Sequence, residues 1–245
     1  MPAVCICSII GINQKNVSAL QRVMKYKNTI SGKFIDRPNR FVAHAAVNGN
    51  IETVHIKNTG RCKELLLPGA DVTLALSNNP KRKTKYDLIS VYKSGIGWIN
   101  IDSQVPNTVV KEWLETGPQQ FPDIQLLKPE CIYGNSRVDF YLECSGRRAF
   151  IEVKGCTLEI AGIGYFPDAP TERGVKHLHE LAKAVGEGYE CFIAFVIAIP
   201  GVTNVLPNRA MHPEFGAALD AAVKAGVKIL YLPCNVTPGE IAICL

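Results

Sequence analysis

Two short segments of alternating polar and apolar residues, separated by Ser145-Gly146, constrain the fold of this chain more than any other feature. Residues 136–143 and 148–154 both alternate in this way. The dipeptide between them suits a two-residue type I′ turn, which favours glycine at its second position. Counting back from this turn places Asp139 directly opposite Glu152. The sequence therefore predicts a β-hairpin that brings two acids together from neighbouring strands.

The register of the predicted hairpin also sorts its side chains by character. Arg137 falls opposite Lys154, on the same face as the two acids. The other face is entirely apolar and consists of Val138, Phe140, Leu142, Ala149, Ile151 and Val153. Because strand side chains alternate between faces, a shift of one residue would exchange the two sets. We therefore expect Asp139 and Glu152 on the face opposite the apolar one.

Two facing carboxylates suggest a cation site. Their Cβ atoms lie roughly 5 Å apart across a strand pair, and like charges at that distance repel. Mg²⁺ or Mn²⁺ relieves this repulsion, because such hard cations bind carboxylates together with waters and phosphate oxygens. Lys154 follows Glu152 on the same face, where its ammonium can orient an attacking water or offset phosphate charge. Glu130 is a candidate third metal ligand, and the alternative for the whole group is an ordinary set of surface ion pairs.

The second half of the chain has the pattern of an α/β domain. Helices are predicted over residues 108–115, 171–185 and 213–225. Between and after them lie apolar strands over residues 191–199 and 227–232. Fully apolar strands that alternate with helices are typical of a partly parallel sheet covered on both faces. We expect a mixed-sheet α/β domain here.

The preceding part reads as short strands broken by turns. Asn48-Gly49 is a strong hairpin signal, since both residues tolerate positive φ. Strands at this spacing suggest a small β-barrel of the OB kind. The strand-like segments are residues 34–35, 41–47, 51–56, 71–76, 86–93 and 98–101.

Charge is divided unevenly between the two parts. Residues 1–105 hold 15 Lys and Arg against 6 Asp and Glu, a net of +9, whereas residues 106–245 hold 12 against 16, a net of −4. Such a basic domain suits a polyanion such as a nucleic acid, although basic surface also serves solubility alone. Candidate phosphate contacts are Arg37, Arg40, Asn58, Arg61, Lys81, Arg82, Lys83 and Lys85.

Composition indicates a folded protein of a reducing compartment. The chain is 47% apolar and 20% charged, which excludes general disorder, and no apolar run reaches the ~18 residues of a membrane span. The nine cysteines form no CxxC pair and no Cys/His grouping, against a disulfide scaffold or zinc site. Residues 1–10 lack the basic leader of a signal peptide. We expect a cytoplasmic protein that does not enter the membrane.

Seven short blocks of sequence stand out along residues 37–232. They are Arg37-Pro-Asn-Arg-Phe41, Asn58-Thr-Gly-Arg61, Tyr86-Asp-Leu88, Ser136-Arg-Val-Asp-Phe140, Ile151-Glu-Val-Lys154, Phe166-Pro-Asp-Ala-Pro-Thr-Glu-Arg-Gly174 and Lys176-His177-Leu178. Through these blocks the chain resembles the sugar fermentation stimulation protein (SfsA) family. The resemblance implies a DNA-binding protein with an N-terminal extension (1–23), an OB-like basic domain (24–105) and a PD-(D/E)xK restriction-endonuclease-like domain (106–245).

The resemblance also implies roles for particular residues. Asp139, Glu152 and Lys154 match the signature of the nuclease superfamily, with a valine where proline often stands. On the helix after Asp168, Glu172, Arg173 and His177 would face the active cleft and contact a scissile phosphate. A solvated helix face is the alternative for these three.

The leading functional hypothesis is a metal-dependent DNA phosphodiesterase that acts on single- or double-stranded DNA. Weak sequence preference is expected, because no base-reading module is evident. The rival is a non-catalytic DNA-binding regulator of sugar (maltose) metabolism that keeps a nuclease-like scaffold. An enzyme acting on sugars is disfavoured, since the sequence has no glycine-rich nucleotide loop. The oligomeric state is left open.

Overall fold

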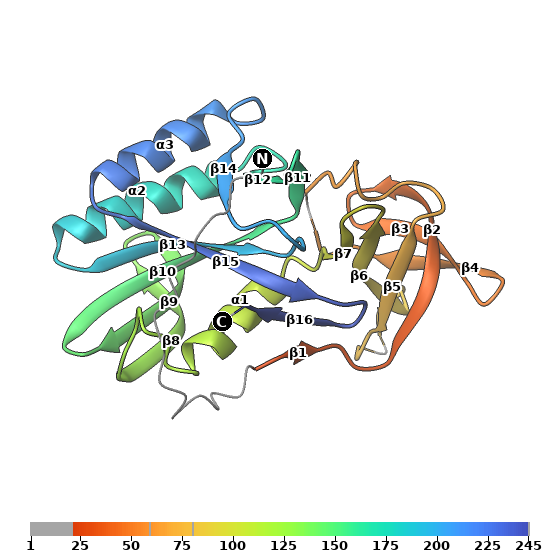
Figure 1. The fold of residues 1–245 in the computed structure, drawn as a ribbon, viewed down its shortest axis with the longest axis horizontal. Helices are drawn as coiled ribbons and strands as arrows, with labels where there is room; N and C mark the ends of the chain where they lie inside the picture. The colour runs from red at the N-terminus through yellow and green to blue at the C-terminus, as the bar shows by residue number, and fades with distance from the viewer. Residues whose placement is uncertain (1–21, 59, 80, 245) are drawn as a thin grey trace, which may run out of the picture.

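The computed structural model describes residues 22–58, 60–79 and 81–244, which form a β-barrel followed by a larger α/β domain (Figure 1). All but the last two residues of the predicted N-terminal extension, 1–23, lie outside the described residues. None of the helices within the described residues is long and apolar enough to cross a bilayer.

The barrel is built from six strands in the order β4-β3-β2-β5-β6-β7. Pairing of β4 with β6 closes the first five into a barrel, so the predicted OB-like architecture is confirmed. Asn48 and Gly49 form the predicted turn, with φ of 49° and 82°. The strands are β2 (Thr29–Asn39), β3 (Val42–Val47), β4 (Asn50–His55), β5 (Asp71–Leu76), β6 (Tyr86–Lys93) and β7 (Gly97–Asn100).

The second domain contains a seven-stranded sheet in the order β1-β16-β15-β13-β10-β9-β8 and a small sheet β11-β12-β14. Strands β10, β13 and β15 run parallel and the outer pairs are antiparallel, which confirms the predicted mixed sheet. The elements are β1 (Met24–Lys25), α1 (Val105–Leu114), β8 (Ile124–Tyr133), β9 (Ser136–Cys144), β10 (Arg147–Cys156), β11 (Leu158–Ile160), β12 (Ile163–Phe166), α2 (Glu172–Gly186), β13 (Glu190–Ile197), β14 (Val205–Pro207), α3 (Pro213–Lys224), β15 (Lys228–Val236) and β16 (Glu240–Ile243).

Strand β1 ties the start of the described chain to the second domain rather than to the barrel. Met24 pairs with Ile241 of β16, and the Tyr26 amide donates to the carbonyl of Gly239. The Tyr26 hydroxyl then donates to Asp102 (3.2 Å), just before α1. The first described strand thus belongs to the large sheet, and the chain then crosses into the barrel, whereas the sequence-based division placed residues 24–105 together.

Both faces of the central strand β10 are buried, because helices cover both sides of the sheet (Figure 1). Ala149 and Ile151 belong to the core on the α1 side, as the apolar face of the hairpin predicts. Phe150 packs on the other side, in a core that includes residues of α2, α3 and the barrel. The face that carries Glu152 is therefore not open to solvent, and this residue is only 2% exposed.

The core on the α1 side depends on a fully buried phenylalanine, Phe121, whose ring meets Trp113 and Phe192 edge-on, at 5.9 and 5.0 Å between centroids. We expect Phe121→Ala to lower the free energy of unfolding by roughly 3–5 kcal/mol, because it leaves a cavity and removes both ring contacts. Urea denaturation followed by circular dichroism measures this. Phe41→Ala is the control, since Phe41 is 51% exposed. Equal stability of the two variants would contradict this view of the core.

Candidate active site

The hairpin that carries the predicted acids forms as its sequence indicates. Ser145 and Gly146 both have positive φ (47° and 73°), and the ladder runs from Arg147–Cys144 to Ile151–Phe140. The next step of this register sets Glu152 level with Asp139. The ladder itself stops at Ile151–Phe140, so the predicted pairing of Arg137 with Lys154 does not form. Arg137 instead contacts Glu130, and Lys154 contacts Glu152.

Asp139 replaces the missing ladder contact with its own side chain. Its Oδ2 accepts a hydrogen bond from the backbone N–H of Val153 (2.7 Å), and its Oδ1 accepts one from the Asn107 side chain (2.8 Å). Burial and then the neighbouring Glu152 carboxylate raise the pKa of Asp139 above its ordinary value. The carboxylate is thus fixed in place from both α1 and β10.

Glu152 lies deeper and has two side-chain partners on one of its oxygens. Its Oε1 contacts the Lys154 ammonium (2.5 Å) and Nδ1 of His177, which is itself buried. Burial alone would raise the pKa of Glu152, but Lys154 and His177 together outweigh it and lower the pKa. The other oxygen, Oε2, is buried and has no hydrogen-bond partner. One half of this carboxylate is therefore left for a further ligand.

Of the three residues predicted on the helix, Arg173 and His177 lie at the site and Glu172 lies outside it. Arg173 lines the cavity at the site, and its Nε donates to Nε2 of His177 (3.3 Å). With Nε2 accepting, the ring proton sits on Nδ1 and is donated to Glu152. His177 therefore supports a carboxylate rather than meeting a phosphate directly. Glu172 points away from the cavity: its side chain is 89% exposed and lies 3.3 Å from His212.

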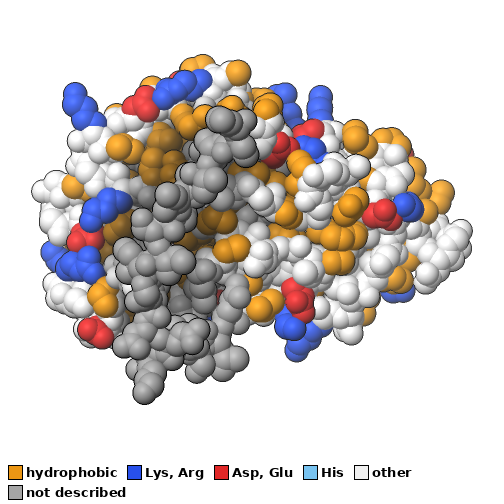
Figure 2. All heavy atoms as spheres, viewed as in Figure 1, with side chains coloured by type: hydrophobic (Ala, Val, Ile, Leu, Met, Phe, Trp, Pro, Cys, Tyr) orange, Lys and Arg blue, Asp and Glu red, His pale blue; other side chains and the backbone are white. Residues whose placement is uncertain are grey.

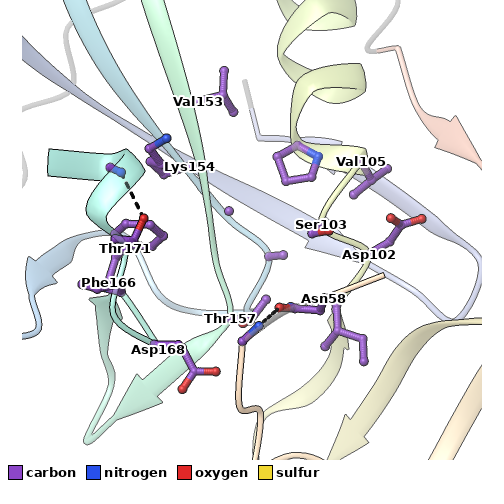
Figure 3. Close-up of a pocket in the computed structure, with 18 of the residues that line it drawn as sticks. Asn58, Asp102, Ser103, Val105, Val153, Lys154, Thr157, Phe166, Asp168 and Thr171 are labelled. Carbon is purple, nitrogen blue, oxygen red and sulfur yellow. Dashed lines mark hydrogen bonds between the residues drawn. The ribbon is translucent and has the colours of Figure 1, made fainter. Parts of the chain in front are cut away.

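A cavity of about 450 Å³ opens beside these groups, between the two domains. Asp139, Glu152 and Lys154 line it together with residues of the barrel, of the stretch before α1 and of the loop before α2. Figure 3 shows Lys154 and Thr171 on one side of it and Asn58 and Asp102 on the other. The hollow beside the carboxylates therefore has walls from both domains.

Two further acids line the cavity, and both already have partners. Oδ2 of Asp102 accepts from the Lys57 ammonium (2.9 Å), and Oδ2 of Asp168 accepts from the backbone N–H of Cys62 (2.8 Å). Sequence reasoning assigned no role to either acid or to Asn107. The only signal for Asp168 was its place in the long block before α2.

Glu130 is not brought to the site. It lies on β8 with a side chain that is 65% exposed, and its nearest ionic partner is Arg137 (3.5 Å). Its backbone has φ of 53°, which interrupts the regular strand there. The predicted third metal ligand is thus absent from the cavity, where Asp139 and Glu152 lie together.

The candidate phosphate contacts also separate into different groups. The guanidinium of Arg37 is engaged inside the protein, where it donates to the backbone carbonyls of Arg40, Asn58, Gly60 and Arg61 at 2.8–3.0 Å. It thereby holds the loop that follows β4. A Cβ at Gly60 would lie 2.8 Å from an oxygen of Asp168, so this loop packs closely against the second domain.

The remaining basic candidates lie on the surface. Arg82 is tied to Asp87 (2.7 Å) and Thr84, whereas Lys81, Lys83 and Lys85 are exposed on the loop between β5 and β6. Arg40 and Arg61 are exposed beside the loop after β4, and Asn58 lines the cavity. The structure thus presents two separate groups of surface cations on the barrel.

The donor set at the cavity fits a hard divalent cation. No group of three or more His, Cys, Asp or Glu side chains within the described ranges converges as a complete metal site. Two carboxylates do converge, and one of them has a buried oxygen without a partner. Mg²⁺ needs only one or two carboxylates when water and phosphate oxygens supply the other ligands. Asp139 and Glu152 are therefore the residues that would hold it.

Comparisons with known proteins cover both domains. A family model described as the SfsA N-terminal OB domain matches residues 35–101, and one described as the Sugar fermentation stimulation protein RE domain matches residues 104–240. The Sugar fermentation stimulation protein homolog of Desulfitobacterium hafniense (strain DSM 10664 / DCB-2) is 53% identical over 218 residues, 89% of this chain and 94% of the relative. That of Ruminiclostridium cellulolyticum is 53% identical over 220 residues, 90% and 96% of the two chains.

A solved structure shows the same arrangement. The structure of Pyrococcus furiosus SfsA in complex with Ca²⁺ superposes with a TM-score of 0.82 at 29% sequence identity, and the match covers 90% of this chain and 95% of that chain. The fold described above is therefore shared over nearly its whole length.

The role of Arg37 gives a prediction about stability. We expect Arg37→Ala to lower the free energy of unfolding by roughly 2–4 kcal/mol, because four carbonyls lose their charged donor. Arg40→Ala is the matched control, since its guanidinium is exposed. Chemical denaturation of both variants measures the difference. If Arg37→Ala were as stable as the control, the internal role of this arginine would be refuted.

Proposed function

This chain belongs to the sugar fermentation stimulation protein family, and we propose that it is a metal-dependent DNA phosphodiesterase with weak sequence preference. The observation that carries the proposal is the meeting of Asp139, Glu152 and Lys154 at one cavity between the domains. A pair of hard oxygen ligands beside a primary ammonium is suited to phosphodiester hydrolysis.

Support for a divalent cation comes from the site and from a relative. The buried, unpartnered Oε2 of Glu152 is an oxygen ligand without another use in the protein. Pyrococcus furiosus SfsA has been solved in complex with Ca²⁺, a cation that prefers oxygen ligands as Mg²⁺ does. We propose Mg²⁺ or Mn²⁺ as the working ion, held by Asp139 and Glu152. When bound, it supplies positive charge to the phosphate oxygens and lowers the pKa of water.

Side chains of the protein orient the attacking water and offset the negative charge of the phosphoryl group. Water adds to phosphorus, the bond to one ester oxygen breaks, and that oxygen leaves with a proton. Lys154 reaches the cavity from beside Glu152, where its ammonium offsets charge on the phosphoryl oxygens and orients the water. Arg173 lines the same cavity and supplies a second positive charge. His177 and Asn107 hold the two carboxylates in position.

DNA is the proposed substrate because the cavity is shared with a basic barrel. Phosphate contacts supply most of the sequence-independent affinity of DNA-binding proteins, and none of the residues at this cavity belongs to a recognised base-reading motif. A cytoplasmic location is part of the proposal, since each of the seven cysteines that the structure describes is a free thiol.

Cleavage assays test the catalytic assignment. We expect the purified protein to cleave labelled DNA with Mg²⁺ or Mn²⁺ and not with EDTA. Asp139→Asn and Lys154→Met should each lower the cleavage rate more than about 100-fold, because the first removes a metal ligand and the second removes the positive charge beside the phosphate. Glu143→Gln, a neutralised acid on the same strand and outside the cavity, should keep the rate. DNA binding without cleavage under all these conditions would instead favour a non-catalytic regulator.

Metal binding has a readout that does not depend on turnover. Saturating Mn²⁺, Mg²⁺ or Ca²⁺ should raise the thermal midpoint of the wild-type protein by on the order of 5 °C, because ligands that bind only the folded state stabilise it. The shift should disappear in Glu152→Gln and persist in Glu143→Gln. An equal shift in Glu152→Gln would remove Glu152 from the ligand set.

A further inference from the structure

Much of the positive charge of the barrel is neutralised by neighbouring acids. On the face shown in Figure 2, lysine and arginine side chains are scattered around the outline, in several places next to acidic ones. Many cations of the barrel have an acidic partner, as in the pairs Lys33–Asp71, Lys57–Asp102, Arg82–Asp87 and Lys93–Glu159. The cations that lack such a partner are therefore the candidates for binding an anion such as a phosphate.

Three unpaired cations surround one pocket. Arg40, Arg61 and Lys63 are exposed, and no carboxylate within residues 22–58, 60–79 and 81–244 forms an ion pair with them. They line a pocket of about 740 Å³ between the barrel and the loop before α2, a size within the ~300–1,000 Å³ range of small-ligand sites. Leu66 and Pro170 add apolar surface to its walls.

This pocket adjoins the catalytic cavity. Gly60, Ala169 and Pro170 line both, so they form the partition between them. Because Arg37 and Asp168 fix the loop that contains Gly60, the spacing between the two hollows is set by the fold. A nucleic-acid strand with its phosphodiester at Asp139 and Glu152 would reach the cations by crossing this partition.

The walls favour an unpaired nucleotide over a base pair. In a duplex the ring faces are stacked and only the groove edges and phosphates are accessible, so an apolar wall has little to contact. An unpaired nucleotide offers a ring face to Leu66 and Pro170 and a phosphate to the cations. Phe41, next to Arg40 in the turn between β2 and β3, leaves a ring that is 51% exposed for stacking of a further base.

We propose that the pocket of Arg40, Arg61 and Lys63 binds an unpaired nucleotide next to the scissile phosphodiester, so that the substrate is single-stranded DNA. The inference rests on the proposed function for the position of the scissile bond. A second basic group lies on the loop between β5 and β6 and consists of Lys81, Lys83 and Lys85. Under this proposal it does not hold that nucleotide.

Binding of fluorescein-labelled oligothymidine, measured by anisotropy without divalent metal in the Asp139→Asn background, tests this proposal. Three double variants each exchange two cations for two carboxylates: Arg61→Glu/Lys63→Glu at the pocket, Lys81→Glu/Lys83→Glu on the loop, and Lys128→Glu/Lys224→Glu on the second domain. We expect the pocket pair to lose about tenfold or more in affinity and about 1.4 in the slope of log K against log salt, roughly 0.7 per phosphate contact. The loop and remote pairs should lose clearly less.

Two results would overturn the proposal. One is a loop pair that weakens binding as much as the pocket pair does. The other is a duplex of the same length that the parent protein binds as tightly as the single strand. Thermal midpoints check that each variant is folded, and Arg61→Gln/Lys63→Gln should show a smaller loss in the same direction if charge reversal unfolds the protein. Because no cleavage is measured, absence of nuclease activity would count against the proposed function and leave this test standing.

Discussion

The close approach of two carboxylates, Asp139 and Glu152, is the constraint on which the rest of this structure depends. Burial and mutual repulsion both disfavour their ionised forms, as the raised pKa of Asp139 shows. Lys154 and His177 reverse this balance for Glu152. Since one partner follows on β10 and the other comes from α2, the charged site exists only when helix and sheet are packed together.

The site is therefore part of the core as well as a wall of the cavity. Phe150 and Glu152 are two residues apart on β10 and share the face under α2, so apolar packing and the hydrogen bond from His177 hold the same helix. Arg173 extends this contact chain through His177 to the wall of the cavity. A buried carboxylate with one free oxygen is costly for stability, and such arrangements are typical of functional sites.

The barrel contributes to this site through two kinds of arginine. Arg37 is internal and holds the loop that closes the cavity against Asp168. Arg40 and Arg61 stand beside it in the chain or in space and remain exposed. Arg37 and Arg40 lie in the same sequence block, so nothing local distinguishes an arginine with a structural role from an exposed one. The difference depends on which backbone carbonyls the folded loop presents.

The sequence by itself determined the hairpin register, because a Ser145-Gly146 turn and period-two alternation are local properties. It likewise determined the barrel followed by a mixed sheet. Only the tertiary structure decided which side chains contact Asp139 and Glu152. Asn107 reaches Asp139 from 32 residues away and His177 reaches Glu152 from 25, whereas Glu130, closer in sequence to Asp139, faces solvent. Local periodicity fixes the face on which a side chain lies, but packing of distant elements fixes what it meets there.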